Sequence, residues 1–268
     1  MAAKSSGPDR AFQGARAINR AEIVDKNFTS FVANWNKKAD RKRHESEPIA
    51  DGTALTGTAF LELFESQMLS RHLDFEARAM RARDEGFYTI GSAGHEGNAA
   101  VARATRPTDP AFLHYRSGGF MMERSRQVEG VDPVYDTCLS LAASAEDPIS
   151  GGRHKVWGSA RLWVLPQTST IASHLPKAVG TAIAIAQARL CGVKLPVPAD
   201  SLVVCSFGDA SVNHATAQAA FNAAGWTTHQ QLPCPVLFVC EDNGIGISVK
   251  APDGWIAASF RARPGIRY

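Results

Sequence analysis

Two short apolar segments, residues 201–207 (SLVVCSF) and 236–240 (VLFVC), constrain the fold more than any other feature of the sequence. Each is rich in β-branched or aromatic residues and is followed by a turn, which is typical of a buried β-strand. The segment between them, residues 212–224, is rich in alanine and favours a helix. A strand, a helix and a second strand in this order predict a right-handed βαβ unit. Because the strands lack polar alternation, we expect an α/β fold with a parallel sheet flanked by helices.

Polar residues follow both strands. Gly208 and Asp209 come directly after the first strand, and Asp242 and Asn243 come directly after the second. Because the carboxyl ends of parallel strands meet at one edge of the sheet, Asp209 and Asn243 should lie on neighbouring loops. Their oxygen atoms suit Mg²⁺, which completes its coordination with phosphate oxygens and water. A helix that begins near Ser211 directs free N–H groups to the same place. A Gly-Asp turn alone is also an ordinary βα turn, and the paired Asn-Gly makes the pattern more specific.

Other parts of the sequence have weaker patterns. The apolar residues between Phe60 and Met68 recur at helical spacing, which predicts one amphipathic helix over residues 58–83. A glycine-rich turn at residues 91–97 should lead into a helix that begins near Asn98. Residues 151–158 (GGRHKVWG) resemble a functional loop more than a regular element. Two apolar helices, residues 175–189 and 212–224, have too few polar residues to face solvent, so we expect one of them to pack against another subunit or domain.

The N-terminal part differs from the rest in charge. Residues 1–50 contain ten Lys or Arg and six Asp or Glu, whereas the remaining residues are nearly balanced. We therefore expect a polar, basic N-terminal arm over residues 1–50, partly disordered, and one α/β domain over residues 51–268. The arm is interpreted either as a solvated tail or as a contact for an acidic partner. Residues 28–35 are apolar enough to dock as a short helix on a neighbour.

Composition excludes several classes of protein. The 44% hydrophobic and 21% charged residues are typical of a globular protein. An apolar run of about 18 residues is absent, which predicts no membrane span. The first residues lack the apolar core of a signal peptide, and the five cysteines form no CxxC pair, so we expect a reducing, cytoplasmic location. A net charge of +3 is too small to indicate nucleic acid.

The strand-turn pattern resembles a known motif. The thiamine diphosphate motif is resembled by two segments together, GDASVNHATAQAAFNAAG and LPCPVLFVCEDNGIGIS. Their sequences are similar to those of the α subunits of 2-oxo acid dehydrogenase decarboxylases, most closely the branched-chain type. The resemblance extends over roughly residues 55–250. It implies that Asp209, Asn243 and the Ile245 carbonyl hold Mg²⁺. It also implies cofactor contacts in the first turn at Gly208, Ala210 and Ser211.

Two departures from the motif concern these turns. Asp242 replaces the first Asn of the Asn-Asn pair, a position that does not ligate the metal. Ala210 replaces the second Gly of Gly-Asp-Gly, which is tolerable while its φ stays negative.

Further cofactor contacts follow from the same resemblance. Tyr115 and Arg116 match a Tyr-Arg pair that grips the diphosphate, and a guanidinium and a phenol are suitable donors to such an anion. Ser169 falls beside the cofactor, and the Ile171 carbonyl meets the aminopyrimidine; both residues are also consistent with an ordinary helix start. The ligand positions of a potassium site in branched-chain relatives map to Thr168, Thr170, Ser173 and His174. The imidazole of His174 is a poor potassium ligand.

Four histidines fall close to motif residues: His95, His114, His154 and His214. A hydrogen-bonded structural role is more common for a histidine than a catalytic one. His114 precedes the Tyr-Arg pair and is the candidate catalytic residue on the substrate side. The resemblance implies that the principal glutamate comes from a β subunit or a β-like domain.

The resemblance implies a function. This function is the thiamine-diphosphate-dependent oxidative decarboxylation of a 2-oxo acid, with a branched-chain acid favoured. The expected partners are a β subunit, in an α₂β₂-like oligomer, and a lipoyl acyltransferase component. The chain should be an incomplete α half, inactive alone. Alternatives are a pyruvate or acetoin dehydrogenase-type enzyme, a transketolase-like enzyme, and a non-catalytic α/β module that binds another diphosphate through Asp209 and Asn243.

Overall fold

The computed structural model describes residues 20–36, 43–167, 170–246 and 249–268. The chain divides into two compact units, Met1–His44 and Glu45–Tyr268. The described part of the first unit contains one helix, α1 (Arg20–Ala33), whose apolar side chains Phe28 and Phe31 are exposed. This helix includes most of the segment for which we expect docking, and the docking stays a prediction.

The second unit contains a five-stranded sheet with the order β2-β3-β1-β4-β5. The strands are β1 (Ala111–Phe112), β2 (Trp157–Ser159), β3 (Val164–Gln167), β4 (Val203–Gly208) and β5 (Val236–Glu241). Strands β3, β1, β4 and β5 are parallel, and β2 is antiparallel to β3. A separate hairpin pairs β6 (Ile245–Gly246) with β7 (Val249–Lys250). The mostly parallel sheet confirms the α/β fold expected from the two apolar segments.

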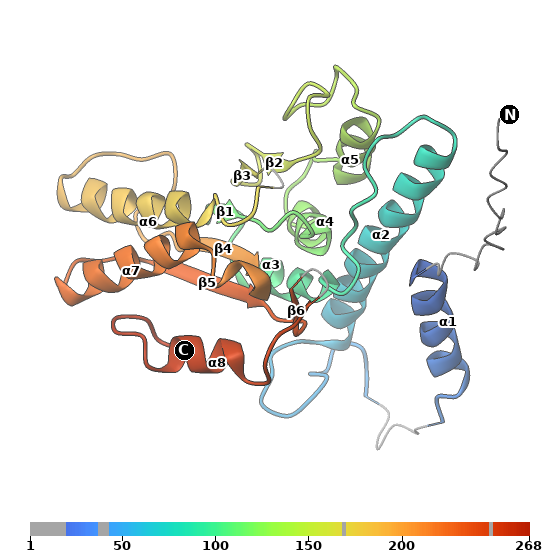
Figure 1. Cartoon of the computed structure of the whole chain (residues 1–268), viewed down its shortest axis with the longest axis horizontal. Helices are drawn as coiled ribbons and strands as arrows, with labels where there is room; N and C mark the ends of the chain where they lie inside the picture. The colour runs from blue at the N-terminus through green and yellow to red at the C-terminus, as the bar shows by residue number, and fades with distance from the viewer. Residues whose placement is uncertain (1–19, 37–42, 168–169, 247–248) are drawn as a thin grey trace, which may run out of the picture. The chain divides into compact units, whose positions relative to one another are not determined.

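Helices cover both faces of the sheet (Figure 1). They are α2 (Gly57–Ala82), α3 (Ala99–Ala104), α4 (Gly118–Arg126), α5 (Pro133–Leu141), α6 (Leu175–Leu190), α7 (Ala215–His229) and α8 (Trp255–Arg261), with 3-10 turns η1 (Glu96–Asn98) and η2 (Asp209–Ser211). Alternate residues of β4 enter two different cores. Val203, Cys205 and Phe207 pack with α6, α7 and α8, whereas Val204 packs with α2, α3 and α4. This alternation follows from the two-residue period of a strand.

The expected βαβ unit is β4, α7 and β5. Its strands pair in parallel from Val203 opposite Val236 to Gly208 opposite Glu241, so both end at the same edge. All six residues of β4 are buried, as a strand covered on both faces requires. β5 is only partly buried, because it is the outer strand of this sheet.

The long helix expected over residues 58–83 is confirmed by α2, but its packed face differs from the predicted one. Its buried positions include Ser66 and Ser70. Ser66 Oγ donates a hydrogen bond to the carboxylate of Glu123 on α4 (2.7 Å), and a methyl group on Gly118 of α4 would lie 2.3 Å from Ser70 Oγ. Small residues therefore bring α2 and α4 close together. Three larger apolar residues of the helix are instead about half exposed: Phe60, Phe64 and Met68.

The two apolar helices α6 and α7 pack in one core with the sheet. Their buried residues include Ala178, Ala182, Ala217 and Phe221. The sheet and α8 bury one apolar face of each helix within this chain, and a contact of either helix with another subunit or domain stays a prediction. None of the helices in the described part of the chain combines the length and apolar character that a membrane span requires.

Candidate functional site

Asp209 lies at the carboxyl edge of the sheet. It is the first residue of η2, directly after β4, and is 7% exposed. Its Oδ1 accepts a hydrogen bond from the N–H of Ala210 (3.0 Å), whereas its Oδ2 is buried without a hydrogen-bond partner among the described residues. Burial, together with the neighbouring carboxylate of Asp242, raises the pKa of Asp209. A desolvated oxygen beside a second carboxylate is costly unless a cation is bound, and Mg²⁺ fits this donor chemistry.

The turn after β5 reaches the same edge. Asp242 Oδ1 accepts a hydrogen bond from the N–H of Gly244 (3.0 Å), and Asn243 Oδ1 accepts one from the N–H of Ile245 (2.9 Å). The N–H of Gly244 also lies near the Asp209 carboxylate, where it partly opposes the rise in pKa. The structure therefore brings together the two turns that contain the three expected metal ligands. An amide oxygen keeps a second lone pair when it accepts one hydrogen bond, so Asn243 retains the capacity to ligate.

The first turn accommodates its departure from the motif. Ala210 lies within η2 and is not among the residues with positive φ. Alanine is therefore tolerated at this glycine position of the motif, because its φ is not positive. Ser211, the last residue of η2, is buried next to it.

The loop after β1 places His114 against the first turn. A side chain on Gly208 would lie 3.5 Å from His114 Nε2, and the N–H of His114 donates a hydrogen bond to Ser206 Oγ (2.9 Å). Burial, together with the nearby His95 and Arg116, lowers the pKa of His114 to about 3. His114 is therefore neutral at neutral pH. The neutral imidazole can donate one hydrogen bond and accept another, but it lacks the second N–H proton and the positive charge of an imidazolium.

Tyr115 and Arg116 follow in the same loop. The Arg116 guanidinium donates a hydrogen bond to the carbonyl oxygen of Gly91 (2.6 Å) and lies over the ring of Tyr115 at 5.1 Å. The Tyr115 carbonyl accepts a hydrogen bond from Trp157 Nε1 (2.9 Å). These contacts fix the loop beside the edge of the sheet. Among the described residues, the bond to Gly91 occupies one of the five N–H donors of the Arg116 guanidinium, which can also bind an anion.

The segment before α6 is described only in part. Ser169 and Thr168 lie outside the described residues, and Ile171 is 40% exposed. His174 donates a hydrogen bond from Nε2 to the Ser206 carbonyl (2.7 Å) and accepts one at Nδ1 from Gln167 (3.1 Å). Both ring nitrogens are therefore engaged, and His174 offers no lone pair to the potassium ion considered above.

One group at this edge was not singled out from the sequence. Glu241, the last residue of β5, is hydrogen-bonded through Oε2 to Nδ1 of His95, and its Oε1 accepts a hydrogen bond from Asn98 Nδ2 (3.5 Å). His95 and His114 stack with their ring centroids 5.2 Å apart. The position of Glu241 directly before Asp242 is the signal that could have identified it, since it also lies at the carboxyl end of a strand.

A cleft of about 240 Å³ opens beside this group. Residues of η1, α3 and the β5 turn line it, among them His95, Asn98, Glu241 and Asn243. The cleft gives solvent and small ligands access to the edge of the sheet where the candidate ligands lie.

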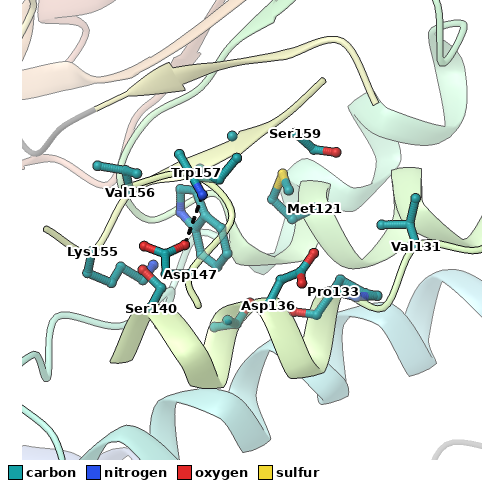
Figure 2. Close-up of a pocket in the computed structure, with 13 residues that line it drawn as sticks. Met121, Val131, Pro133, Asp136, Ser140, Asp147, Lys155, Val156, Trp157 and Ser159 are labelled. Atoms are coloured by element: carbon teal, nitrogen blue, oxygen red, sulfur yellow. Dashed lines mark hydrogen bonds between the residues drawn. The ribbon is translucent and has the colours of Figure 1, made fainter. Parts of the chain in front are cut away.

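A second, smaller cavity lies between α4, α5 and β2 (Figure 2). Its volume of about 20 Å³ is enough for a water molecule and too small for an organic substrate. Lys155 lies at one end of it, near Asp147 and Ser140, with its Nζ 3.4 Å from the centre of the Trp157 ring. Burial lowers the pKa of Lys155 to about 7. The expected functional loop at residues 151–158 therefore contributes a buried amine to this cavity.

The fold and the two turns define a class of protein. The family described as Dehydrogenase E1 component matches residues 65–263. The chain belongs to this family, as the resemblance of its strand-turn motifs predicts.

Individual relatives are similar over most of the chain. The mitochondrial 2-oxoisovalerate dehydrogenase subunit alpha of Homo sapiens is 26% identical over 259 residues, which cover 95% of this chain and 53% of that protein. The 2-oxoisovalerate dehydrogenase subunit alpha of Bacillus subtilis is 25% identical over 211 residues, which cover 77% of this chain and 56% of that protein. This chain thus spans about half the length of the curated relatives it matches.

Proposed function

We propose that this chain is the α part of a thiamine-diphosphate-dependent decarboxylase component of a 2-oxo acid dehydrogenase. The observation that carries the proposal is the buried Oδ2 of Asp209, which has no hydrogen-bond partner in the described part of the chain, at the sheet edge of a member of the E1 family. The names of the relatives, which act on 2-oxoisovalerate, support a branched-chain 2-oxo acid as the substrate.

The residues of the two turns would hold the metal. Asp209 supplies a carboxylate oxygen, Asn243 an amide oxygen and Ile245 a backbone carbonyl, which together are hard ligands for Mg²⁺. The positive ion would offset the repulsion between the carboxylates of Asp209 and Asp242, which otherwise destabilises this edge. The diphosphate oxygens would complete the coordination.

The loop after β1 would hold the diphosphate. Arg116 donates one side-chain hydrogen bond to the residues that the structure describes, and this bond to Gly91 restricts the orientation of the guanidinium before an anion arrives. Tyr115 adds a phenol donor. The other proposed contacts are Gly208, Ala210, Ser211, Ser169 and Ile171.

When bound, thiamine diphosphate would supply the electron sink that decarboxylation of a 2-oxo acid requires. The residues of this chain bind and orient the cofactor and exclude water around it. His114, neutral and buried next to Gly208, would hydrogen-bond to a substrate or cofactor group without adding charge. We propose that a β subunit or β-like domain supplies the principal glutamate and that a lipoyl acyltransferase component accepts the acyl group.

Calorimetric titration of the full chain tests this proposal. With Mg²⁺ present, thiamine diphosphate should bind more tightly than ADP, and Asp209→Asn should weaken the binding of thiamine diphosphate strongly. Tighter binding of ADP would favour the alternative, a non-catalytic diphosphate-binding module. Decarboxylation of 3-methyl-2-oxobutanoate is expected only after addition of a β partner.

A further inference from the structure

His95, His114 and Glu241 form a second cluster at this edge, separate from Asp209. One nitrogen of each imidazole and one carboxylate oxygen lie within 4.8 Å of one another. The residues come from the turn before η1, the loop after β1 and the end of β5, so only the folded chain brings them together. His95 and His114 are 8% and 7% exposed, and the side chain of Glu241 is 10% exposed.

The chemistry of this cluster differs from that of the magnesium ligands. Two imidazoles and one carboxylate are a set that binds Zn²⁺ and similar divalent transition ions, and three protein ligands leave a coordination position open. Mg²⁺ prefers oxygen ligands alone. The two clusters therefore suit different ions.

Supporting contacts orient the donors. Asn98 Nδ2 donates a hydrogen bond to Glu241 Oε1 (3.5 Å), which leaves Oε2 directed at His95. The Asn98 side chain is itself fixed, because its Oδ1 accepts a hydrogen bond from the N–H of Phe120 (2.7 Å). Hydrogen bonds of this kind, made to the ligands of a metal, are a general feature of metal sites.

Access and charge complete the argument. The cleft of about 240 Å³ is lined by both His95 and Glu241 and provides a path for an ion. Glu241 is followed by Asp242, so two carboxylates meet at the end of β5 next to Asp209. A bound cation would neutralise part of this negative charge.

We propose that His95, His114 and Glu241 bind a divalent transition ion such as Zn²⁺, at a site distinct from the Mg²⁺ ligands of the proposed function. The same residues are joined by the hydrogen bond between His95 and Glu241 and by the stacking of the two imidazoles. Binding needs His95 Nδ1 unprotonated, so the ion takes the place of the proton shared with Glu241 and that proton moves to Nε2 or to solvent.

The experiment is a titration of the full chain with Co²⁺, a spectroscopic substitute for Zn²⁺, without thiamine diphosphate or Mg²⁺. We expect one ion per chain and visible ligand-field absorption. Glu241→Gln and His95→Gln should each weaken binding roughly tenfold or more, as loss of a ligand implies. His229→Gln, at an exposed histidine of α7, should bind Co²⁺ as the unmodified chain does.

A thermal melt with Zn²⁺ serves as the second measurement, because ligand binding to the native state raises the melting temperature. The rise should occur in the unmodified chain and in His229→Gln, and it should be absent in Glu241→Gln. Equal Co²⁺ affinity in Glu241→Gln, or loss of binding in His229→Gln, would overturn the proposal. Because no cofactor is added, failure here leaves the proposed function untouched, and failure to bind thiamine diphosphate leaves this site untouched.

Discussion

The carboxylates of Asp209 and Asp242 lie beside each other although they follow two different strands, and one buried oxygen of Asp209 has no hydrogen-bond partner within the ranges that the structure describes. Parallel pairing of β4 with β5 causes this, because it ends both strands at Gly208 and Glu241 in the same register. The arrangement costs stability in the absence of a cation and favours binding of one. A substitution that removes the charge of Asp209 should therefore weaken cation binding and raise the free energy of unfolding of the metal-free chain.

Asp209→Asn tests this opposition. Without metal, the variant should be more stable than the unmodified chain by about 1 kcal/mol, because an amide removes one charge and can donate a hydrogen bond to Asp242. Its binding of Mg²⁺ and thiamine diphosphate should be lost. Urea unfolding without metal and calorimetry with it measure the two effects. A destabilised variant that retains cofactor binding would contradict both expectations.

The free energy of unfolding at acidic pH should depend on the protonation of the Asp209 carboxylate. The pKa of Asp209 is raised in the folded state, so the folded chain binds a proton more readily than the unfolded chain does. Its contribution is present at low pH and is lost as the pH rises through the folded-state pKa. The unmodified chain without metal should therefore lose stability relative to Asp209→Asn over this range, and saturating Mg²⁺ should remove the difference.

Tyr115→Phe and Arg116→Lys separate the two donors proposed for the diphosphate. Loss of the guanidinium fork should weaken thiamine diphosphate by about 2–3 kcal/mol, whereas loss of the phenol should cost about 1 kcal/mol. Titration calorimetry gives the affinities. Because Arg116 also bonds to Gly91, the unfolding of each variant has to be measured as a control. An affinity change below tenfold in Arg116→Lys would show that Arg116 acts only on the loop.

Lys155 should make stability depend on alkaline pH. Its folded-state pKa of about 7 lies below the ordinary value of 10.5, so between these values the unfolded chain binds the extra proton. The free energy of unfolding should rise with pH in this window, by up to about 1.4 kcal/mol per pH unit. Lys155→Met should lack this slope. Parallel slopes for the two chains in urea unfolding from pH 7 upward would refute a buried, neutral amine.

The contact between α2 and α4 gives a test by compensation. Gly118→Ala should destabilise the chain by about 1–3 kcal/mol, because the new methyl group would lie 2.3 Å from Ser70 Oγ. Ser70→Ala removes that atom, and its Cβ would lie 3.4 Å from the new methyl group. The double variant should therefore recover most of the loss. Additive effects in urea unfolding would show that the two residues do not meet.

Local sequence predicted those parts of the site that depend on neighbours along the chain. Asp209 and Asn243 were predicted to share an edge from the apolar strands before them. The prediction holds because the right-handed crossover fixes which ends of the two strands come together. His174 shows the limit of such reasoning: its two hydrogen bonds, to Gln167 and Ser206, depend on how α6 packs on β4.

By itself the sequence determined the α/β fold, the βαβ unit and the turns that follow its strands, because each depends on apolar periodicity and turn residues within a short segment. Only the tertiary structure decided which face of α2 is buried, since that depends on the space available beside Gly118 and Glu123 of α4. It also decided the pairing of His95 with Glu241, which lie 146 residues apart in the sequence. Contacts of this range follow from the packing of whole elements, and no local pattern specifies them.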